Sequence, residues 1–167
     1  MTIIDGKLLA ENLRHKIANE VRQFSRPPGL AVILVGDDSA SQAYVRNKTK
    51  ACVEVGFYSD QIHKSANITQ DELLSEVRRL NDNKTIDGIL VQLPLPSHID
   101  ANVIIEAINP EKDVDGFSSE NIGKLMQNKP FLSPCTPKGV VAMLASLNYE
   151  LRGKDCVIIG ASKIVGR

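Results

Sequence analysis

Residues 30–50 read LAVILVGDDSASQAYVRNKTK, and this stretch decides the fold. The apolar run at 30–35 is bounded by turn residues, which is typical of a strand buried on both faces. Residues 36–39 then turn the chain and supply capping side chains for a helix. That helix is expected to cover 39–55 and to end at Gly56, since glycine commonly stops helices. A strand followed directly by a helix indicates an α/β fold built on a parallel sheet.

The predicted helix carries three reactive types of side chain on or beside one face. Tyr44 and Lys48 are four residues apart and therefore share a face, and Ser41 lies three residues before Tyr44. A phenol, an amine and a small hydroxyl in this arrangement form either a reactive cluster or a solvated helix face. Because charged helix residues mostly meet water, the stretch on its own favours the solvated face.

Apolar periodicity and turn signals place the other elements on the same alternating plan. Helices are expected at 6–24, 70–83, 100–108 and 137–147, with a brief helical turn at 119–127, and further strands at 58–65, 86–92 and 156–159. Thr69 and Glu72 fit a capping box, while Thr136 followed by Pro137 fits a helix start. Strands alternating with helices predict a parallel sheet flanked by helices, with 58–65 near its edge. Ligands bind beyond the carboxyl ends of such strands, where Gln92 is expected to lie.

The composition gives no sign of several kinds of partner and site. The chain has 167 residues with 20 Lys+Arg and 20 Asp+Glu, so its formal net charge is zero. This balance gives no indication of nucleic acid or an anionic membrane as a partner. No apolar run approaches the roughly 20 residues that span a bilayer, and the N-terminus lacks a signal-peptide pattern. The histidines and cysteines lack metal-ligand spacing, so we expect no metal site, a reducing cytoplasmic location, and core positions for Cys52, Cys135 and Cys156.

The end of the chain indicates the start of a second domain. The apolar run at 156–159 leads into a glycine turn, which resembles the beginning of a dinucleotide-binding unit. The G-x-G-x-x-G fingerprint would have glycine where this chain has Ser162 and Val165. A single strand also cannot form its own sheet. We therefore expect a fragment, with a complete domain at 1–148 and the first strand of a Rossmann-like nucleotide domain at 149–167.

Five stretches together resemble one enzyme family. They are residues 35–48, 87–96, 112–117, 134–137 and 160–167, with the sequences VGDDSASQAYVRNK, DGILVQLPLP, KDVDGF, PCTP and GASKIVGR. In this order, over essentially the whole chain, they are similar to the bacterial-type bifunctional methylenetetrahydrofolate dehydrogenase/methenyltetrahydrofolate cyclohydrolases. The resemblance implies NADP-dependent oxidation of 5,10-methylenetetrahydrofolate to the methenyl cation, followed by hydrolysis to 10-formyltetrahydrofolate.

The resemblance also assigns roles to four catalytic residues. Lys48 matches the family's catalytic lysine, and Tyr44 matches its folate-contacting tyrosine. Gln92 matches the glutamine that hydrogen-bonds the lysine, and Asp115 matches the carboxylate that holds the pterin. The substrate is expected to contact the last three of these, together with a supporting serine and two residues of the strand exit, namely Ser41, Leu93 and Pro94.

The family's nucleotide loop matches the end of the chain. The expected cofactor contacts are Gly160, Ser162, Lys163, Ile164, Gly166 and Arg167. Many relatives have arginine where this chain has Ala161, so the choice between NADP and NAD stays open. The resemblance further implies a homodimer in the complete protein, with tetrahydrofolate one-carbon derivatives as partners. It also implies a part in one-carbon metabolism, which supports purine, methionine and histidine biosynthesis.

The expected chemistry sets a condition on Lys48. An ammonium beside a developing one-carbon cation would oppose it, so Lys48 is expected to have a lowered pKa or to lean on Gln92 and Tyr44. Such an amine suits the proton transfers of cyclohydrolysis. Hydride transfer instead needs a stacked nicotinamide and no protein base. Asp115 suits the paired N–H donors of a pterin.

Two other functions fit part of the sequence. Short-chain dehydrogenases also use Tyr-x-x-x-Lys, but their nucleotide glycines precede the tyrosine, whereas here they follow Tyr44 by over 100 residues. That order argues against this class. A non-catalytic folate- or partner-binding module stays open, and binding of a folate analogue without turnover would identify it.

Overall fold

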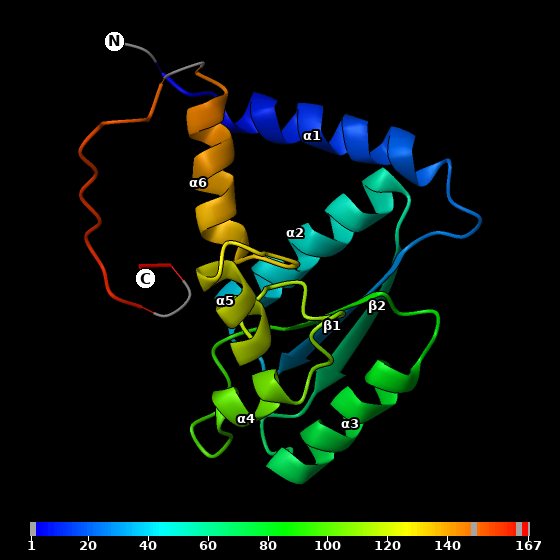
Figure 1. Ribbon diagram of the computed structural model, residues 1–167. Helices are drawn as coiled ribbons and strands as arrows, with labels where there is room; N and C mark the ends of the chain where they lie inside the picture. Colours follow the sequence, from blue (N-terminus) through cyan, green and yellow to red (C-terminus); the bar gives the residue numbers. More distant parts are fainter. Residues whose placement is uncertain (1–2, 148–149, 163–164, 167) are drawn as a thin grey trace.

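A computed structural model describes residues 3–147, 150–162 and 165–166. These residues contain one parallel sheet of three strands, β1 (Gly29–Val35), β2 (Tyr58–Lys64) and β3 (Gly88–Val91), in the order β2-β1-β3 (Figure 1). Ile33 in the central strand pairs with Ile62 of β2 and Val91 of β3. The predicted parallel α/β arrangement is confirmed, and β2 lies at an edge as expected.

Helices cover both faces of this sheet. The described residues form α1 (Gly6–Val21), α2 (Ser39–Val55), α3 (Gln70–Asp82), α4 (Ala101–Glu106), α5 (Ser119–Met126) and α6 (Cys135–Ala145). Figure 1 shows α2 over one face with α1 outside it, and α3 and α4 over the opposite face. A parallel sheet needs cover on both faces because its strands are apolar on both. In the same view α5 lies to the left of the strand arrowheads, and α6 stands above α5.

The side chains of β1 alternate between two apolar cores. On one face, Ile33 and its alternate neighbours pack against α3 and α4, in a core that includes Ala31, Val35, Leu73, Val77, Leu80, Ile89 and Ile104. On the other face, Val32 and Leu34 pack with Val45 of α2 and Leu90 of β3. This division explains the unbroken apolar run, because every residue from 30 to 35 packs in or against one core or the other.

α2 has the predicted bounds, and both of its ends are capped. The Asp38 carboxylate accepts a hydrogen bond from the N–H of Ser41 at 2.7 Å, and Gly56 ends the helix with a φ of +85°. α3 begins with the predicted capping box, in which Thr69 and Glu72 each bond the backbone N–H of the other. These two helices, on opposite faces, are therefore fixed by local sequence as well as by packing.

Several other ends differ from the prediction by a few residues. α1 ends at 21 rather than 24, β3 covers 88–91 rather than 86–92, and α4 covers 101–106 rather than 100–108. At α4 the reason is that Asp100 is the N-cap, whose carboxylate accepts a hydrogen bond from the N–H of Asn102 at 2.8 Å. At β3, Asp87 lies just before the strand, and its side-chain carboxylate accepts a hydrogen bond from the N–H of Gly29 at 2.8 Å.

The predicted start of α6 is wrong. The helix begins at Cys135 with Pro134 as its N-cap and no side-chain cap, whereas the sequence pattern predicted Thr136 as the N-cap. Pro137 is consequently the third helical residue rather than the first. Proline is tolerated there because the N–H groups of the first turn have no partner within the helix.

The predicted strand at 156–159 is not formed. After a turn at 151–154, residues 155–162 run as an extended segment away from the sheet (Figure 1), and Val157 and Ile159 are 86% and 99% exposed. A strand needs a hydrogen-bonded neighbour, and no described strand lies beside this segment. The expected first strand of a Rossmann-like domain is therefore absent from the described residues.

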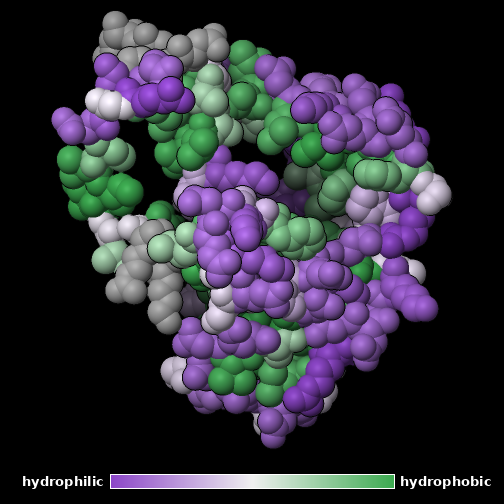
Figure 2. Space-filling model, viewed as in Figure 1, coloured by the Kyte–Doolittle hydropathy of each residue, from purple (hydrophilic) through white to green (hydrophobic). Residues whose placement is uncertain are grey.

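The surface is mostly polar in the view of Figure 2, with apolar side chains gathered over α6 and the C-terminal segment. On α6 they include Val141, which is 60% exposed. The expectation of three core cysteines is correct only for Cys52, because Cys135 and Cys156 are exposed. No helix in the described ranges has the length and apolar character to cross a membrane.

Candidate functional site

The predicted contact between Lys48 and Gln92 is present. The Nζ of Lys48, on α2, donates a hydrogen bond to the Oε1 of Gln92 at 3.1 Å. The other end of this amide is also held, because Nε2 of Gln92 donates to the carbonyl oxygen of Leu93 at 2.7 Å. The backbone N–H of Gln92 continues the pairing of the sheet by donating to the carbonyl oxygen of Ile33 at 2.8 Å. The exit of β3 therefore determines the orientation of the oxygen that holds the lysine.

Asp115 lies in the loop between α4 and α5 and is half-buried. Burial raises the pKa of its carboxyl above the ordinary aspartate value, the Lys48 ammonium opposes this rise, and the Asp113 carboxylate adds to it. The described residues donate no hydrogen bond to the Asp115 carboxylate. An amine and an amide thus make contact beyond the carboxyl ends of the strands, where parallel sheets bind ligands, and the acid lies near enough for the lysine charge to act on its pKa.

Tyr44 lies one helical turn before Lys48 on α2 and is 63% exposed. Within the described residues, no hydrogen bond joins its hydroxyl to Lys48, so the support expected from Tyr44 is not found there. Gln92 holds the lysine instead. The exposed ring beside the amine presents an aromatic face on which a flat ligand ring can stack.

The other predicted substrate contacts lie at the two element ends that carry the site. Ser41 is 4% exposed in the first turn of α2. Its backbone N–H bonds to Asp38, and this bond is the main reason that the pKa of the Asp38 carboxyl is lowered. Ser41 thus helps to begin the helix of the candidate lysine. Leu93, half-buried, and Pro94, exposed, follow β3 where the chain leaves the sheet.

The predicted cofactor residues do not form a nucleotide site within the described part of the chain. Gly160 and Ser162 are exposed, and the N–H of Gly166 donates to the carbonyl oxygen of Ser162 at 3.0 Å. Any side chain at Gly166 would collide with the carbonyl oxygen of Gly160, so the two glycines approach closely. Among the described residues, neither a strand leading into Gly160 nor a helix N-terminus beside it is present to hold a pyrophosphate. Lys163, Ile164 and Arg167 lie outside the described residues.

Three residues support the loop of Asp115 but received no role from the sequence pattern. Lys112 donates to carbonyl oxygens at the end of α3, and the buried Asp113 accepts a hydrogen bond from the buried Asn121. The sequence held one signal, which is a pair of acidic residues separated by a valine and followed by glycine. Loop residues have no periodicity, so this pattern does not tell which acid faces inward.

Cys135, at the start of α6, contacts the loop of Asp115. Its thiol donates weakly to the carbonyl oxygen of Val114 at 3.6 Å. Although the residue as a whole is exposed, partial burial of its sulfur raises the pKa of the thiol, and the nearby Asp115 carboxylate raises it further. The start of α6 therefore lies near the candidate acid, and its thiol is held in the neutral form.

The structure contains a cavity that is separate from this site. It has a volume of about 150 Å³, lies between α2 and β2, and is lined by residues that include Arg46 and His63 but none of the predicted site residues. Among the described residues, no three His, Cys, Asp or Glu side chains gather closely enough to hold a metal ion.

Comparison with known families gives two matches. The description "Tetrahydrofolate dehydrogenase/cyclohydrolase, catalytic domain" matches residues 4–115. The description "Tetrahydrofolate dehydrogenase/cyclohydrolase, NAD(P)-binding domain" matches residues 134–167. The "Bifunctional protein FolD" of Ruthia magnifica subsp. Calyptogena magnifica is 65% identical over 167 residues, which are 100% of this chain and 60% of that protein. The chain therefore spans 60% of the length of this curated relative.

Solved structures of lower sequence identity have nearly the same fold. The bifunctional enzyme FolD, a methylenetetrahydrofolate dehydrogenase/cyclohydrolase from Campylobacter jejuni, is 46% identical with a TM-score of 0.96, over 99% of this chain and 60% of that one. The FolD of Trypanosoma brucei, solved with NADP cofactor and inhibitor, is 38% identical with a TM-score of 0.94, over 99% of this chain and 58% of that one.

Proposed function

Since the chain belongs to the tetrahydrofolate dehydrogenase/cyclohydrolase family, we propose that Lys48, Gln92 and Asp115 form its binding site for one-carbon derivatives of tetrahydrofolate. In a protein of the relatives' length, this site oxidises 5,10-methylenetetrahydrofolate to the methenyl compound with NADP and hydrolyses that compound to 10-formyltetrahydrofolate. The observation that carries the proposal is the hydrogen bond from Lys48 to Gln92 beside the charge of Asp115.

The cyclohydrolase step is the one for which the described residues are best suited. Water adds to the methenyl carbon and loses one proton, which leaves a hydroxyl on that carbon. The bond from the carbon to one ring nitrogen then breaks as the nitrogen gains a proton and the hydroxyl releases its own proton to solvent, which leaves the formyl C=O. An amine held by the Gln92 oxygen is placed to take the first proton and return it to the leaving nitrogen. Lys48 is therefore the general acid/base of the proposal, and Gln92 sets its position.

Asp115 supports the proposal because its carboxylate suits the N–H donors of a pterin. A pterin offers amino and ring N–H groups side by side, which match a carboxylate. The Asp115 carboxylate is half-buried and accepts no hydrogen bond from the described residues. Bound donors would stabilise its charged form, while the exposed ring of Tyr44 is available to stack on the folate.

Hydride transfer requires a nucleotide, and NADP when bound would accept the hydride. The residues at 156–162 form neither the strand nor the helix N-terminus that would hold it, so no step is assigned to this segment. This observation favours a second candidate for the chain as it stands, which is folate binding without hydride transfer. Titration with 5-formyltetrahydrofolate, compared with a dehydrogenase assay on the same chain, separates the two.

The test of the main proposal is hydrolysis of 5,10-methenyltetrahydrofolate by a Lys48→Met variant in a protein of the relatives' length. Loss of general acid/base catalysis is expected to lower the rate by roughly 10²–10⁴-fold while 5-formyltetrahydrofolate still binds. Lys50→Met, which removes an exposed lysine from the same helix, is the control and should retain the rate. Hydrolysis at the parent rate by Lys48→Met would contradict the assignment.

For the longer protein we also propose a cytoplasmic homodimer with a part in one-carbon metabolism. This assembly has neither nucleic acid nor a membrane as its partner. The mass of the native product, measured under conditions that preserve assemblies, tests both the length of the protein and its dimeric state.

A further inference from the structure

We infer that Lys112 and Asp113 are positioning residues that fix the Asp115 carboxylate by anchoring both ends of the loop at 112–118. The inference rests on the proposed function, because it explains how the loop presents Asp115 to a folate. Neither residue needs to touch the ligand.

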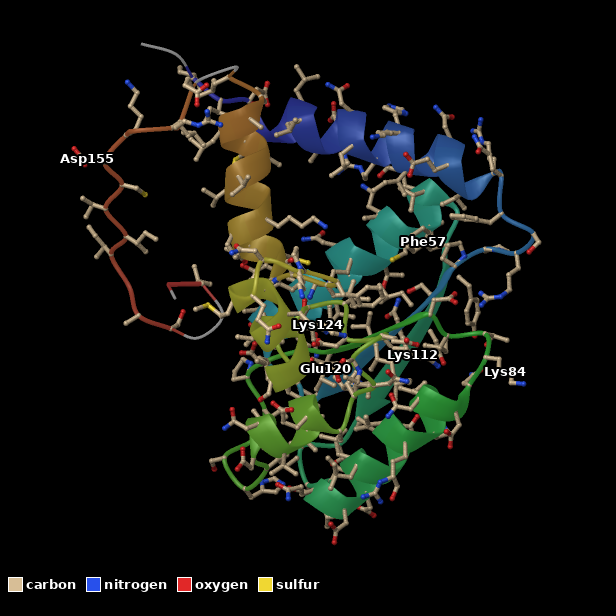
Figure 3. All side chains as sticks on the ribbon, viewed as in Figure 1. Phe57, Lys84, Lys112, Glu120, Lys124 and Asp155 are labelled. Atoms are coloured by element: carbon tan, nitrogen blue, oxygen red, sulfur yellow. The ribbon has the colours of Figure 1, made fainter. Side chains whose placement is uncertain are left out.

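Lys112 ties the start of the loop to the end of α3. Its Nζ donates to three backbone carbonyl oxygens there, those of Leu80 at 3.1 Å, Asn81 at 2.6 Å and Asn83 at 2.9 Å. Figure 3 shows Lys112 beside this end of the helix. Carbonyl groups at a helix end lack the N–H partners of a next turn, and the helix dipole favours a cation there. The carbonyl oxygen of Lys112 also accepts the N–H of Ile89 on β3, at 2.7 Å.

Asp113 ties the loop to the start of α5. It is 1% exposed, and its Oδ2 accepts the N–H of Ser118 at 2.8 Å and the Nδ2 of Asn121 at 3.0 Å. Ser118 is the N-cap of α5, so the carboxylate holds the residue at which this helix begins. A second acceptor, the carbonyl oxygen of Pro110 at 2.9 Å, orients the Asn121 amide. A buried carboxylate is stable only when it is hydrogen-bonded, so these donors hold Asp113 in one place.

The middle of the loop is packed against its neighbours. A Cβ at Gly88 would lie 2.5 Å from Cγ1 of Val114, so the valine fills the space above that glycine of β3. Gly116 has a φ of +67°, and a Cβ there would lie 2.7 Å from the carbonyl carbon of Ser133. Every residue from 112 to 116 other than Asp115 therefore holds the loop.

Asp115 is left with a fixed backbone and a carboxylate that accepts no hydrogen bond from the described residues. Because the loop is already ordered, a ligand that bonds this carboxylate does not have to supply the cost of ordering it. A functional group held by the packing and hydrogen bonds of its neighbours also keeps its geometry. Loss of an anchor is therefore expected to weaken binding through Asp115.

The test is a double-mutant cycle on the binding of 5-formyltetrahydrofolate, measured by titration calorimetry. It compares the parent chain with Asp113→Ala, Asp115→Ala and the double variant. If Asp113 acts through Asp115, each single substitution weakens binding about tenfold, and the double variant binds no more weakly than Asp115→Ala. Losses that add in the double variant would show that Asp113 acts independently of Asp115 and would overturn the inference.

Conservative variants show whether Asp113 and Lys112 act through their hydrogen bonds or through their charge. Both donors reach the same oxygen of Asp113, so the amide oxygen of Asp113→Asn is able to accept both bonds. Its binding is expected to stay within about threefold of the parent. Lys112→Met and Lys112→Arg test the other anchor, which keeps the inference testable if Asp113→Ala does not fold. Methionine should weaken binding about tenfold, and arginine, which keeps its donors, should restore most of it.

Two outcomes distinguish this inference from the proposed function. Parent-like binding by folded Asp113→Ala and Lys112→Met, with weak binding by Asp115→Ala, would overturn only the inference. Parent-like binding by Asp115→Ala would overturn the folate site itself. Asp87→Ala is the matched control, since that carboxylate also accepts hydrogen bonds, from Arg26 and Gly29, at the far end of β3. It should lower Tm and leave binding unchanged.

Discussion

Burial raises the pKa of the Asp115 carboxyl, so this residue opposes the stability of the free chain at neutral pH. The folded chain binds the proton more tightly than the unfolded chain, and stability therefore falls as the pH rises above the ordinary aspartate pKa. Asp115→Asn removes this effect. It is expected to raise the free energy of unfolding at pH 7, with a gain that shrinks toward pH 4 as the parent carboxyl becomes protonated. Urea unfolding at both pH values measures the difference.

The same titration at Asp115 bears on binding. As the pH falls through its raised pKa, the carboxylate becomes protonated and loses one of its acceptor sites, so affinity for 5-formyltetrahydrofolate should fall. In Asp115→Asn this pH dependence should disappear. An equal gain in stability at pH 4 and pH 7, or an unchanged binding profile in the variant, would contradict the assigned ionisation.

Gly116 is the residue at which the loop tolerates least change. Its φ of +67° disfavours any side chain, and a Cβ would press on Ser133. Gly116→Ala is therefore expected to cost about 2 kcal/mol of unfolding free energy. Gly123→Ala is the control, because nothing lies within 4 Å of a Cβ at that position inside α5. It should stabilise by about 0.5–1 kcal/mol, and equal effects of the two substitutions in urea unfolding would refute the loop geometry.

Single residues of the site were predictable to different degrees. Helical spacing placed Lys48 on one face of its helix, and the family resemblance paired it with Gln92, which the structure places at 3.1 Å. No pattern indicated that Asp113 would be buried while the Asp115 carboxylate accepts no hydrogen bond from the described residues. The difference depends on donors from α5, which follow later in the chain and reach Asp113 only in the folded structure.

Among the secondary-structure elements, α3 depends most visibly on its cap. Thr69 and Glu72 satisfy two N–H groups at its start. Thr69→Ala should therefore cost about 1 kcal/mol of unfolding free energy, measured by urea unfolding. Ser75→Ala in the same helix is the control, since its exposed hydroxyl bonds only to the backbone of the preceding turn and its effect should stay within about 0.5 kcal/mol. Equal losses would show that the cap contributes nothing of its own.

The elements whose bounds the sequence predicts best are those with their own end signals. α2 has Asp38 before it and Gly56 after it, and its predicted bounds are correct. α6 has no side-chain cap, so its start is set by packing of Pro134 near Gly116, and the predicted N-cap was wrong. The run at 156–159 has the composition of a strand but no neighbour in the described residues with which to pair.

At the scale of the whole molecule, the exposed apolar run at 156–159 is expected to promote self-association. Val157 and Ile159 are 86% and 99% exposed, and β-branched side chains on an unpaired extended segment favour pairing between copies. Lysine at both positions should raise the monomer fraction in sedimentation velocity under reducing conditions. The control for added charge is Gln127→Lys. It places a lysine just after α5, away from the apolar run, and should have little effect on the monomer fraction. Equal monomer fractions in all three proteins would contradict the expectation.

The alternating plan of the whole chain was predictable because each strand and helix has its own period. The meeting of Lys48, Gln92 and Asp115 depends on the parallel sheet, whose strands bring distant segments to one end. Sequence patterns give the direction of those strands but not the contacts beyond them. The anchors of the loop therefore became visible only in the fold.

Among the described residues, the two cores on either side of β1 differ in size. The core on the α3 and α4 side contains twelve buried residues, whereas the core that joins β1 to α2 contains four. Regions with fewer buried contacts open more readily, so backbone amides of α2 should exchange with deuterium sooner than those of α3. The candidate lysine therefore lies on the helix that is expected to open more often. A bound folate should slow deuterium exchange in α2 far more than in α3.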